Sequence, residues 1–330
     1  MKLTRRTTLK FALAAGGAAL AAPALARGPQ VIRFSHIMQP QGHPKGEAAE
    51  MMKTMVAERM GGDVELEVFS NASLFNDEKV LEAMALGDVQ LAAPALSKFD
   101  TFTKVFRVFD LPFIFKDDAA VSAFEDSDTG KDMLASLSEQ GLVGLAFWRN
   151  GLKQLSANKP LLMPEDARGL KFRIQPSPVI EAQFKELGAN PQKMAFPEVY
   201  GALQTGVVDG CENPWTNIWK QKFYEVQDGF TATNHGVIDY AVVADMAFWN
   251  GLDNDVRTEL ESIMTEVTEF ERSRALELDM ESLESLKAAG TEIRELTAEQ
   301  RAAWVEAMRP VWDQFSDEIG AGIIDAAAAA

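Results

Sequence analysis

The sequence predicts the same order of secondary-structure elements twice, and this repeat constrains the fold more than any other feature. In each copy a strand, a helix, a second strand, a second helix and a third strand follow one another, and glycine ends each helix. The copies cover residues 31–93 and 171–211. Four positions of the first copy superpose in register on four of the second: Val80, Ala83, Gly87 and Val89 on Val199, Ala202, Gly206 and Val208. We therefore expect an α/β protein with two lobes of the same βαβ type and a cleft between them.

Three segments are expected to join the lobes. A turn at residues 149–151, after an apolar strand over 142–148, would lead into the second lobe, and residues 234–236 would lead back. Residues 252–289 contain neither Gly nor Pro, and their apolar residues recur at steps of three and four, so we expect a helix of roughly 55 Å that spans both lobes. The predicted division is 27–148 with 237–270 for lobe 1, and 149–236 with 271–330 for lobe 2.

The first 26 residues are typical of an export signal. Arg5-Arg6 precede an apolar run from Phe11 to Ala22, and Ala24-Leu25-Ala26 has the small residues of a cleavage site. The paired arginines favour the twin-arginine export route, with cleavage after Ala26 and a periplasmic location. A membrane anchor is the alternative, although the run is short and consists mostly of Ala and Gly.

Charge and motif content exclude several classes of function. The formal net charge is −17, and loss of the export signal removes four basic residues and no acid, which gives −21. Such a surface repels nucleic acid, and it makes any site for an anion depend on a few well-placed cations. Cys211 is the only cysteine, so no intrachain disulfide can form. The sequence has no zinc motif or phosphate loop, no cofactor is predicted, and no nucleophile and base have supporting spacing, so we predict no enzyme.

Arg173 is the strongest candidate for a ligand contact. Apolar residues alternate with polar ones over 170–175, which predicts a short strand that stops before Pro176. Ser177-Pro178 then predicts the N-cap and first turn of a helix. The guanidinium would lie at the end of a strand beside a helix N-terminus, where an anion is favoured. From the residues alone, an ordinary surface arginine remains the alternative.

These segments closely resemble the extracytoplasmic solute-binding proteins of TRAP transporters, in the dicarboxylate-binding branch. The likeness extends over nearly the whole chain after the export signal and is most specific over residues 197–214. Shorter shared segments are Pro44-Lys45-Gly46, Gly87-Asp88-Val89-Gln90, Asp110-Leu111-Pro112-Phe113 and Ser156-Ala157-Asn158-Lys159-Pro160. The resemblance implies that Arg173 clamps a ligand carboxylate and that Asn213 hydrogen-bonds it.

The resemblance also suggests weaker candidates. Lys153 stands where many family members carry a second arginine, and lysine keeps the charge but loses the bidentate fork. Lys45 could supply a cation from the first lobe; either lysine could instead be a surface charge. His36 could line the cleft or satisfy its own loop. The aromatic residues Trp148, Phe196 and Trp215 are candidates for cleft walls, with buried core as the alternative for Trp148.

The predicted function is that of a periplasmic receptor that closes on a small organic acid and delivers it to TRAP membrane permease subunits. A C4-dicarboxylate such as succinate, malate or fumarate is the expected ligand. Two alternatives stay open: a receptor for a monocarboxylate, such as a 2-oxo or sugar acid, and a ligand-sensing partner of a membrane sensor kinase.

Overall fold

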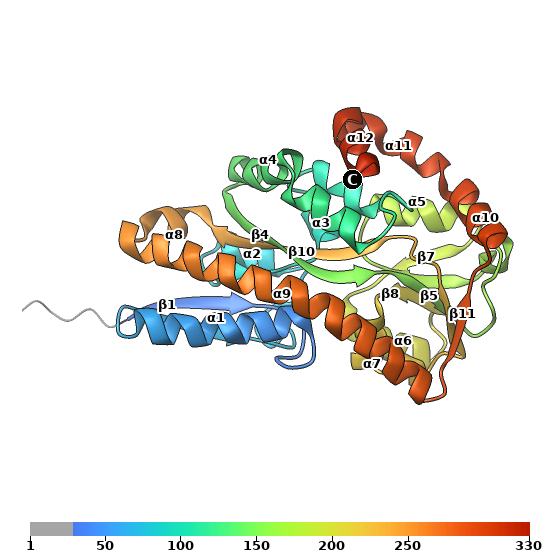
Figure 1. The fold of residues 1–330 in the computed structure, drawn as a ribbon, viewed down its shortest axis with the longest axis horizontal. Coiled ribbons are helices and arrows are strands. Elements are labelled where there is room, and N and C mark those ends of the chain that lie inside the picture. The colour runs from blue at the N-terminus through green and yellow to red at the C-terminus, as the bar shows by residue number, and fades with distance from the viewer. Residues whose placement is uncertain (1–28) are drawn as a thin grey trace, which may run out of the picture.

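Two β-sheets lie side by side in the computed structural model, which describes residues 29–330 (Figure 1). The predicted export signal lies outside the described residues. The first sheet has the order β2-β1-β3-β10-β4, with β1 (Gln30–Ser35), β2 (Val64–Phe69), β3 (Leu91–Ala92), β4 (Leu142–Leu152) and β10 (Val237–Asp245). The second has the order β11-β9-β5-β8-β6-β7, with β5 (Gln154–Ala157), β6 (Lys171–Ile174), β7 (Asn190–Lys193), β8 (Gly210–Asn213), β9 (Gly229–Ala232) and β11 (Glu292–Glu295).

The predicted repeat of elements is confirmed by the pairing of the strands. Strand β1 pairs in parallel with β2 and β3, and β6 pairs in parallel with β7 and β8. An antiparallel strand then follows in each sheet, β10 beside β3 and β5 beside β8. Gly87 follows α2 (Val80–Ala85) and Gly206 follows α6 (Val199–Gln204), and their φ angles of 81° and 70° are left-handed, a conformation that glycine adopts without strain.

Helices cover both faces of the first sheet, so its interior strand β10 is buried on both sides. Ala241 and Val243 face the core under α2, α3 (Asp118–Asp126) and α4 (Asp128–Ser136). Tyr240 and Val242 face the opposite core, under α1 (Pro44–Met60). This alternation follows from the period of two along a strand.

Helix α9 (Asn254–Ala288) confirms the predicted lobe-spanning helix. It packs against α1 and β4 at the first sheet and against α7 (Trp215–Lys220) at the second (Figure 1). The described residues contain no helix that is both long enough and apolar enough to cross a membrane.

The predicted turn at residues 149–151 is wrong. Strand β4 continues to Leu152 and pairs with β10 over its whole length, with a register shift between Arg149 and Gly151. Gly151 has a φ of 141°, so the residue that suggested a turn instead accommodates an irregularity inside the strand. The chain passes to the second sheet only after Leu152.

The C-terminal helices return toward the first sheet. Helix α10 (Ala298–Met308) lies beside α5 (Pro178–Glu186) on the second sheet, α11 (Pro310–Ile319) also packs against α5, and α12 (Ala321–Ala329) reaches α3 (Figure 1). The remaining helix, α8 (Met246–Gly251), follows β10. Residues 271–330 were predicted to belong to lobe 2, but α12 contacts α3 beside the first sheet. The division of the chain between the two lobes stays a prediction.

Candidate binding cleft

A cleft lies between the two sheets, at the carboxyl ends of their parallel strands. The free space between its lining residues, with open solvent included, is about 370 Å³. The first sheet and its loops contribute Ile37, Met38, Asp77, Glu78, Ala95, Lys98, Ile238 and Tyr240. The second half contributes Arg173, Gln175, Phe196, Pro197, Asn213 and Asn217. The carboxyl ends of parallel strands are the usual place for a ligand site in α/β proteins.

Arg173 lies in this cleft with a charge that no carboxylate neutralises at ion-pair distance among residues 29–330. It is 1% exposed, and its Nε and Nη2 donate to the carbonyl oxygen of Met194 at 3.1 and 2.9 Å. The guanidinium carbon lies 5.7 Å from the centroid of the Phe196 ring. Burial lowers the pKa of Arg173, but a guanidinium stays protonated at neutral pH. The residue therefore offers a positive charge to an anion in the cleft.

The Ser177 cap predicted beside Arg173 is present. The Ser177 hydroxyl accepts a hydrogen bond from the backbone N–H of Ile180, and Pro178 occupies the first turn of α5. The strand that carries Arg173 thus ends where the sequence predicts.

Asn213, at the end of β8, has its amide held by two neighbours. Its Oδ1 accepts a hydrogen bond from Asn217 Nδ2 at 3.1 Å, and its Nδ2 lies 3.7 Å from the Cys211 sulfur. A thiol is a weak acceptor, so the amide nitrogen keeps a donor for a ligand. Asn213 and Phe196 line the same cleft as Arg173.

Lys98, which the sequence analysis did not single out, is a second cation in the cleft. Its Nζ lies 2.6 Å from Glu78 Oε1, and the side chains are 6% and 28% exposed. Burial lowers the pKa of Lys98, Glu78 and Asp77 oppose this effect, and the charge of Arg173 adds to it. A groove lined by Glu78, Lys98 and Lys193 continues from the cleft toward solvent.

The internal repeat contained a signal for Lys98. The register that superposes Val80 on Val199 also places Lys98 opposite Asn217, and both residues follow the third strand of their copy. Both line the cleft.

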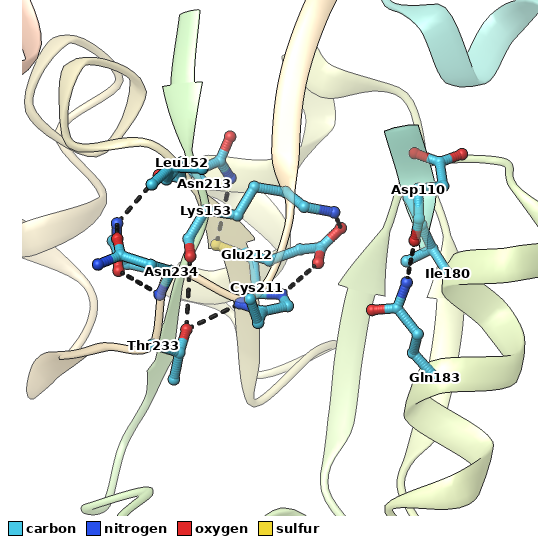
Figure 2. A network of polar contacts seen from close by, with 12 residues as sticks. Asp110, Leu152, Lys153, Ile180, Gln183, Cys211, Glu212, Asn213, Thr233 and Asn234 are labelled. Carbon is cyan, nitrogen blue, oxygen red and sulfur yellow. Dashed lines mark hydrogen bonds and ion pairs between the residues drawn. The ribbon is translucent and has the colours of Figure 1, made fainter. Parts of the chain in front are cut away.

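Lys153 is held by an ion pair outside the cleft lining. Its Nζ lies 2.9 Å from Glu212 Oε1 (Figure 2), and Glu212 Oε2 lies 2.8 Å from His235 Nε2. Burial would raise the pKa of Glu212, but Lys153 and His235 outweigh it and lower that pKa to about 2. The charge of Lys153 is therefore neutralised within the protein.

Lys45 and His36 also lie outside the lining. Lys45 Nζ donates to the Ala93 carbonyl oxygen at 2.9 Å and lies 3.5 Å from the centroid of the Tyr240 ring. Burial lowers the pKa of Lys45 to about 8. His36 Nδ1 accepts from the Met38 N–H at 3.3 Å, and burial together with Lys45 lowers the pKa of His36 to about 3. Lys45 thus lies behind Tyr240, which itself faces the cleft.

Two of the predicted wall residues belong to hydrophobic cores instead. Trp148 is fully buried, and its Nε1 donates to Thr268 Oγ1 of α9 at 3.0 Å. Trp215 packs against Phe230, with 6.4 Å between the ring centroids. The cleft lining thus brings together Arg173, Asn213 and Phe196 from the predicted set and leaves out Lys45, Lys153, His36, Trp148 and Trp215.

Comparison with known proteins gives consistent matches along the chain. The family model for the bacterial extracellular solute-binding proteins, family 7, matches residues 34–318. The C4-dicarboxylate-binding periplasmic protein of Vibrio cholerae is 51% identical over 92% of this chain and 91% of its own length.

Solved structures extend the likeness to three dimensions. A TRAP periplasmic solute-binding protein from Shewanella oneidensis, with bound succinate, superposes with a TM-score of 0.90 at 44% identity, over 91% of this chain and 99% of the other. A TRAP periplasmic solute-binding protein from Pseudomonas aeruginosa, with bound L-malate, gives a TM-score of 0.84 at 44% identity, over 87% and 100%.

Proposed function

Because the chain belongs to family 7 of the bacterial extracellular solute-binding proteins, we propose that it is a periplasmic receptor for a C4-dicarboxylate. The family predicted from the sequence is thereby confirmed. The protein binds the acid between its two sheets and passes it to a TRAP permease in the membrane. The names of the V. cholerae relative and of the two ligand-bound structures support this ligand class. The proposed function includes no catalytic step.

The observation that carries the proposal is the state of Arg173. A buried charge is costly unless an opposite charge or strong hydrogen bonds compensate for it. Arg173 contacts a neutral carbonyl and an aromatic face, and no carboxylate among residues 29–330 pairs with it. A ligand carboxylate supplies the missing charge through short, charge-assisted hydrogen bonds. The amide nitrogen of Asn213 donates to the same carboxylate.

Lys98 supplies the second cation that distinguishes a dicarboxylate from a monocarboxylate. Lys153 is already paired with a fully buried Glu212, whereas Lys98 is paired with the more exposed Glu78 at the mouth of the cleft. A second ligand carboxylate therefore shares Lys98 with Glu78. If Lys98 stays paired with Glu78 alone when the ligand binds, Arg173 is the only cation left for a ligand carboxylate, and the protein is a receptor for a monocarboxylate.

Succinate and butyrate test the proposal because they differ by one carboxylate at the same chain length. We expect calorimetry on protein purified from the periplasm to give tight binding of succinate and at least about 100-fold weaker binding of butyrate. Equal affinity for the two acids would remove the second cation from the site. Binding of neutral sugars without binding of either acid would overturn the assignment of Arg173.

A variant at Lys98 separates the contribution of Lys98 to binding from that of Arg173. Lys98→Met should weaken the binding of succinate by about 10-fold and leave the binding of butyrate unchanged, because only the second carboxylate loses its partner. Lys131→Met is the matched control, since it removes the same charge from a side chain that is 69% exposed. A loss of affinity for both acids in Lys98→Met would contradict the assignment.

A further inference from the structure

Buried polar side chains connect Asn213 with the first sheet. Asn217 Nδ2 donates to Asn213 Oδ1 at 3.1 Å, while Asn217 Oδ1 accepts from Asn150 Nδ2 at 3.1 Å and lies 3.2 Å from His43 Nε2. Asn150 Nδ2 also donates to the Tyr240 hydroxyl at 2.8 Å. Each of these residues is at most 1% exposed. We call this set the amide relay.

The relay joins elements from both halves of the molecule. Asn213 ends β8 and Asn217 lies in α7, whereas Asn150 and Tyr240 belong to β4 and β10. His43 is the residue before α1. The hydrogen bonds of Asn217 therefore hold the second half against the first at the wall of the cleft.

An amide has a donor end and an acceptor end, so the relay has a direction. If Asn217 turns its amide around, its Nδ2 faces Asn150 and its Oδ1 faces Asn213, and both neighbours must turn as well or lose their bonds. In the observed direction every step donates toward the cleft, and the last amide presents Nδ2 rather than Oδ1. Only this direction suits an anionic ligand.

We propose that Asn217 is a positioning residue that fixes the amide of Asn213 with its donor end toward the ligand. Because its other end is held by Asn150 and His43, Asn217 ties this orientation to contact between the two sheets. The inference rests on the proposed function, because it concerns how the same site receives a carboxylate. An isolated asparagine could present either end, whereas the relay makes one end available.

The charged and titratable groups around Asn217 are the same in wild type and variants, so each variant is compared with wild type at the same pH. Burial, followed by the charge of Lys45, lowers the pKa of His43 well below its ordinary value, so His43 stays neutral. Asp279 accepts from the N–H of Thr216, next to Asn217, and burial raises its pKa to about 7. The groups on the surrounding elements are His36, His43, Lys45, Lys220 and Asp279. All five are present in wild type and variants alike, so comparison at one pH cancels them.

Asn217→Asp tests the proposal with an almost isosteric change. An ionised carboxylate cannot donate to Asn213 Oδ1, so Asn213 must turn and present its oxygen to the ligand. A protonated carboxyl regains a donor, and burial keeps its pKa high enough to be reached. We therefore expect succinate affinity to fall about 30-fold below wild type at about pH 8.5 and to recover to within about 5-fold at about pH 6.0.

Controls separate this positioning role from simple damage. Asn254→Asp adds the same charge at an exposed position and should bind like wild type at both pH values. In an Asn213→Ala background, Asn217→Asp should cost clearly less affinity than it does in wild type, because the misdirected amide is gone and only repulsion between the new carboxylate and the ligand remains. A loss that is equal at both pH values, or one that is as large without Asn213 as with it, overturns the proposal.

Two further outcomes are also decisive. If Asn217→Asp is unfolded at about pH 8.5 by circular dichroism, Asn217→Ala takes its place: about a 10-fold loss at both pH values supports the proposal, and unchanged affinity overturns it. If wild type does not bind succinate but binds another carboxylate, the proposed ligand fails, and the same variants are then measured with that acid.

Discussion

Two buried cations in the second half of the molecule, Arg173 and Lys153, have opposite relations to their surroundings. Both are at most 1% exposed. Arg173 faces the cleft and bonds a neutral carbonyl, whereas Lys153 is neutralised by Glu212. Glu212 and Asn213 are neighbours on β8, and successive side chains of a strand point to opposite faces, so one strand supplies an internal counterion and the proposed ligand contact. Burial alone thus does not distinguish the proposed binding cation from an internally paired one; the absence of an internal carboxylate partner among residues 29–330 does.

The largest expected effect comes from removing the neutralised cation. Lys153→Met should destabilise the protein by about 3 to 5 kcal/mol, because Glu212 would be left buried without its lysine. Urea unfolding measures this loss. Adding Glu212→Gln to the same chain should recover a large part of it, and a double variant no more stable than Lys153→Met would show that the ion pair is not the cause.

Changing the cation without an internal partner should affect binding rather than folding. Arg173→Lys keeps the charge but loses the planar fork, so we expect succinate affinity to fall by about 2 kcal/mol, roughly 30-fold, with little change in unfolding. Calorimetry and urea unfolding on the same sample separate the two effects. Wild-type affinity in this variant would mean that binding depends only on the charge at this position and not on the planar shape of the guanidinium.

Asp279 extends the comparison to a buried carboxyl without a cation at ion-pair distance among residues 29–330. Burial raises its pKa to about 7, while Glu212, also buried, has a pKa of about 2 because of Lys153 and His235. A carboxyl whose pKa is higher in the folded than in the unfolded state binds more protons when folded. Its contribution to stability is therefore lost as pH rises from about 4 to about 7.

Asp279→Asn should remove this part of the pH dependence. Its Oδ1 can still accept from the Thr216 N–H and hydroxyl, as Asp279 does. Between about pH 5 and about pH 8 the variant should gain roughly 1 to 2 kcal/mol relative to wild type in urea unfolding. Asp110 and Asp239, whose pKa values burial raises to about 6, act equally in both proteins. If the free energies of unfolding of wild type and Asp279→Asn change with pH in parallel, Asp279 is not the source of this pH dependence.

The sequence predicts those parts of the fold that depend on local periodicity. The long helix over 252–289, the strand before Pro176 and the order of elements in both copies all follow from patterns of apolar residues and glycines. The turn at residues 149–151 was wrong because Gly151 is typical both of a turn and of an irregular position inside a strand. Only pairing with β10, which is distant in sequence, decides between them.

The site was predictable only in part because pairing partners are a tertiary property. Arg173 and Asn213 occupy strand ends, and those positions can be predicted from the sequence. The sequence around Lys153 does not indicate that Glu212 pairs with it, and the sequence around Lys45 does not indicate that Lys45 lies behind Tyr240. Lys98 lies in a short 3-10 turn that has no periodic pattern, so only its register in the repeat indicated its place.

The order of the strands also determines when the protein can fold during its synthesis. Strand β10 lies between β3 and β4 inside the first sheet, but it is made after β5 to β9. In the second sheet, β11 follows α9 but only adds an edge strand beside β9. The first sheet therefore cannot be completed until the ribosome has added β10, and long-range pairing of this kind is slow. The nascent protein must keep the unpaired edges of β3 and β4 from associating until β10 has emerged.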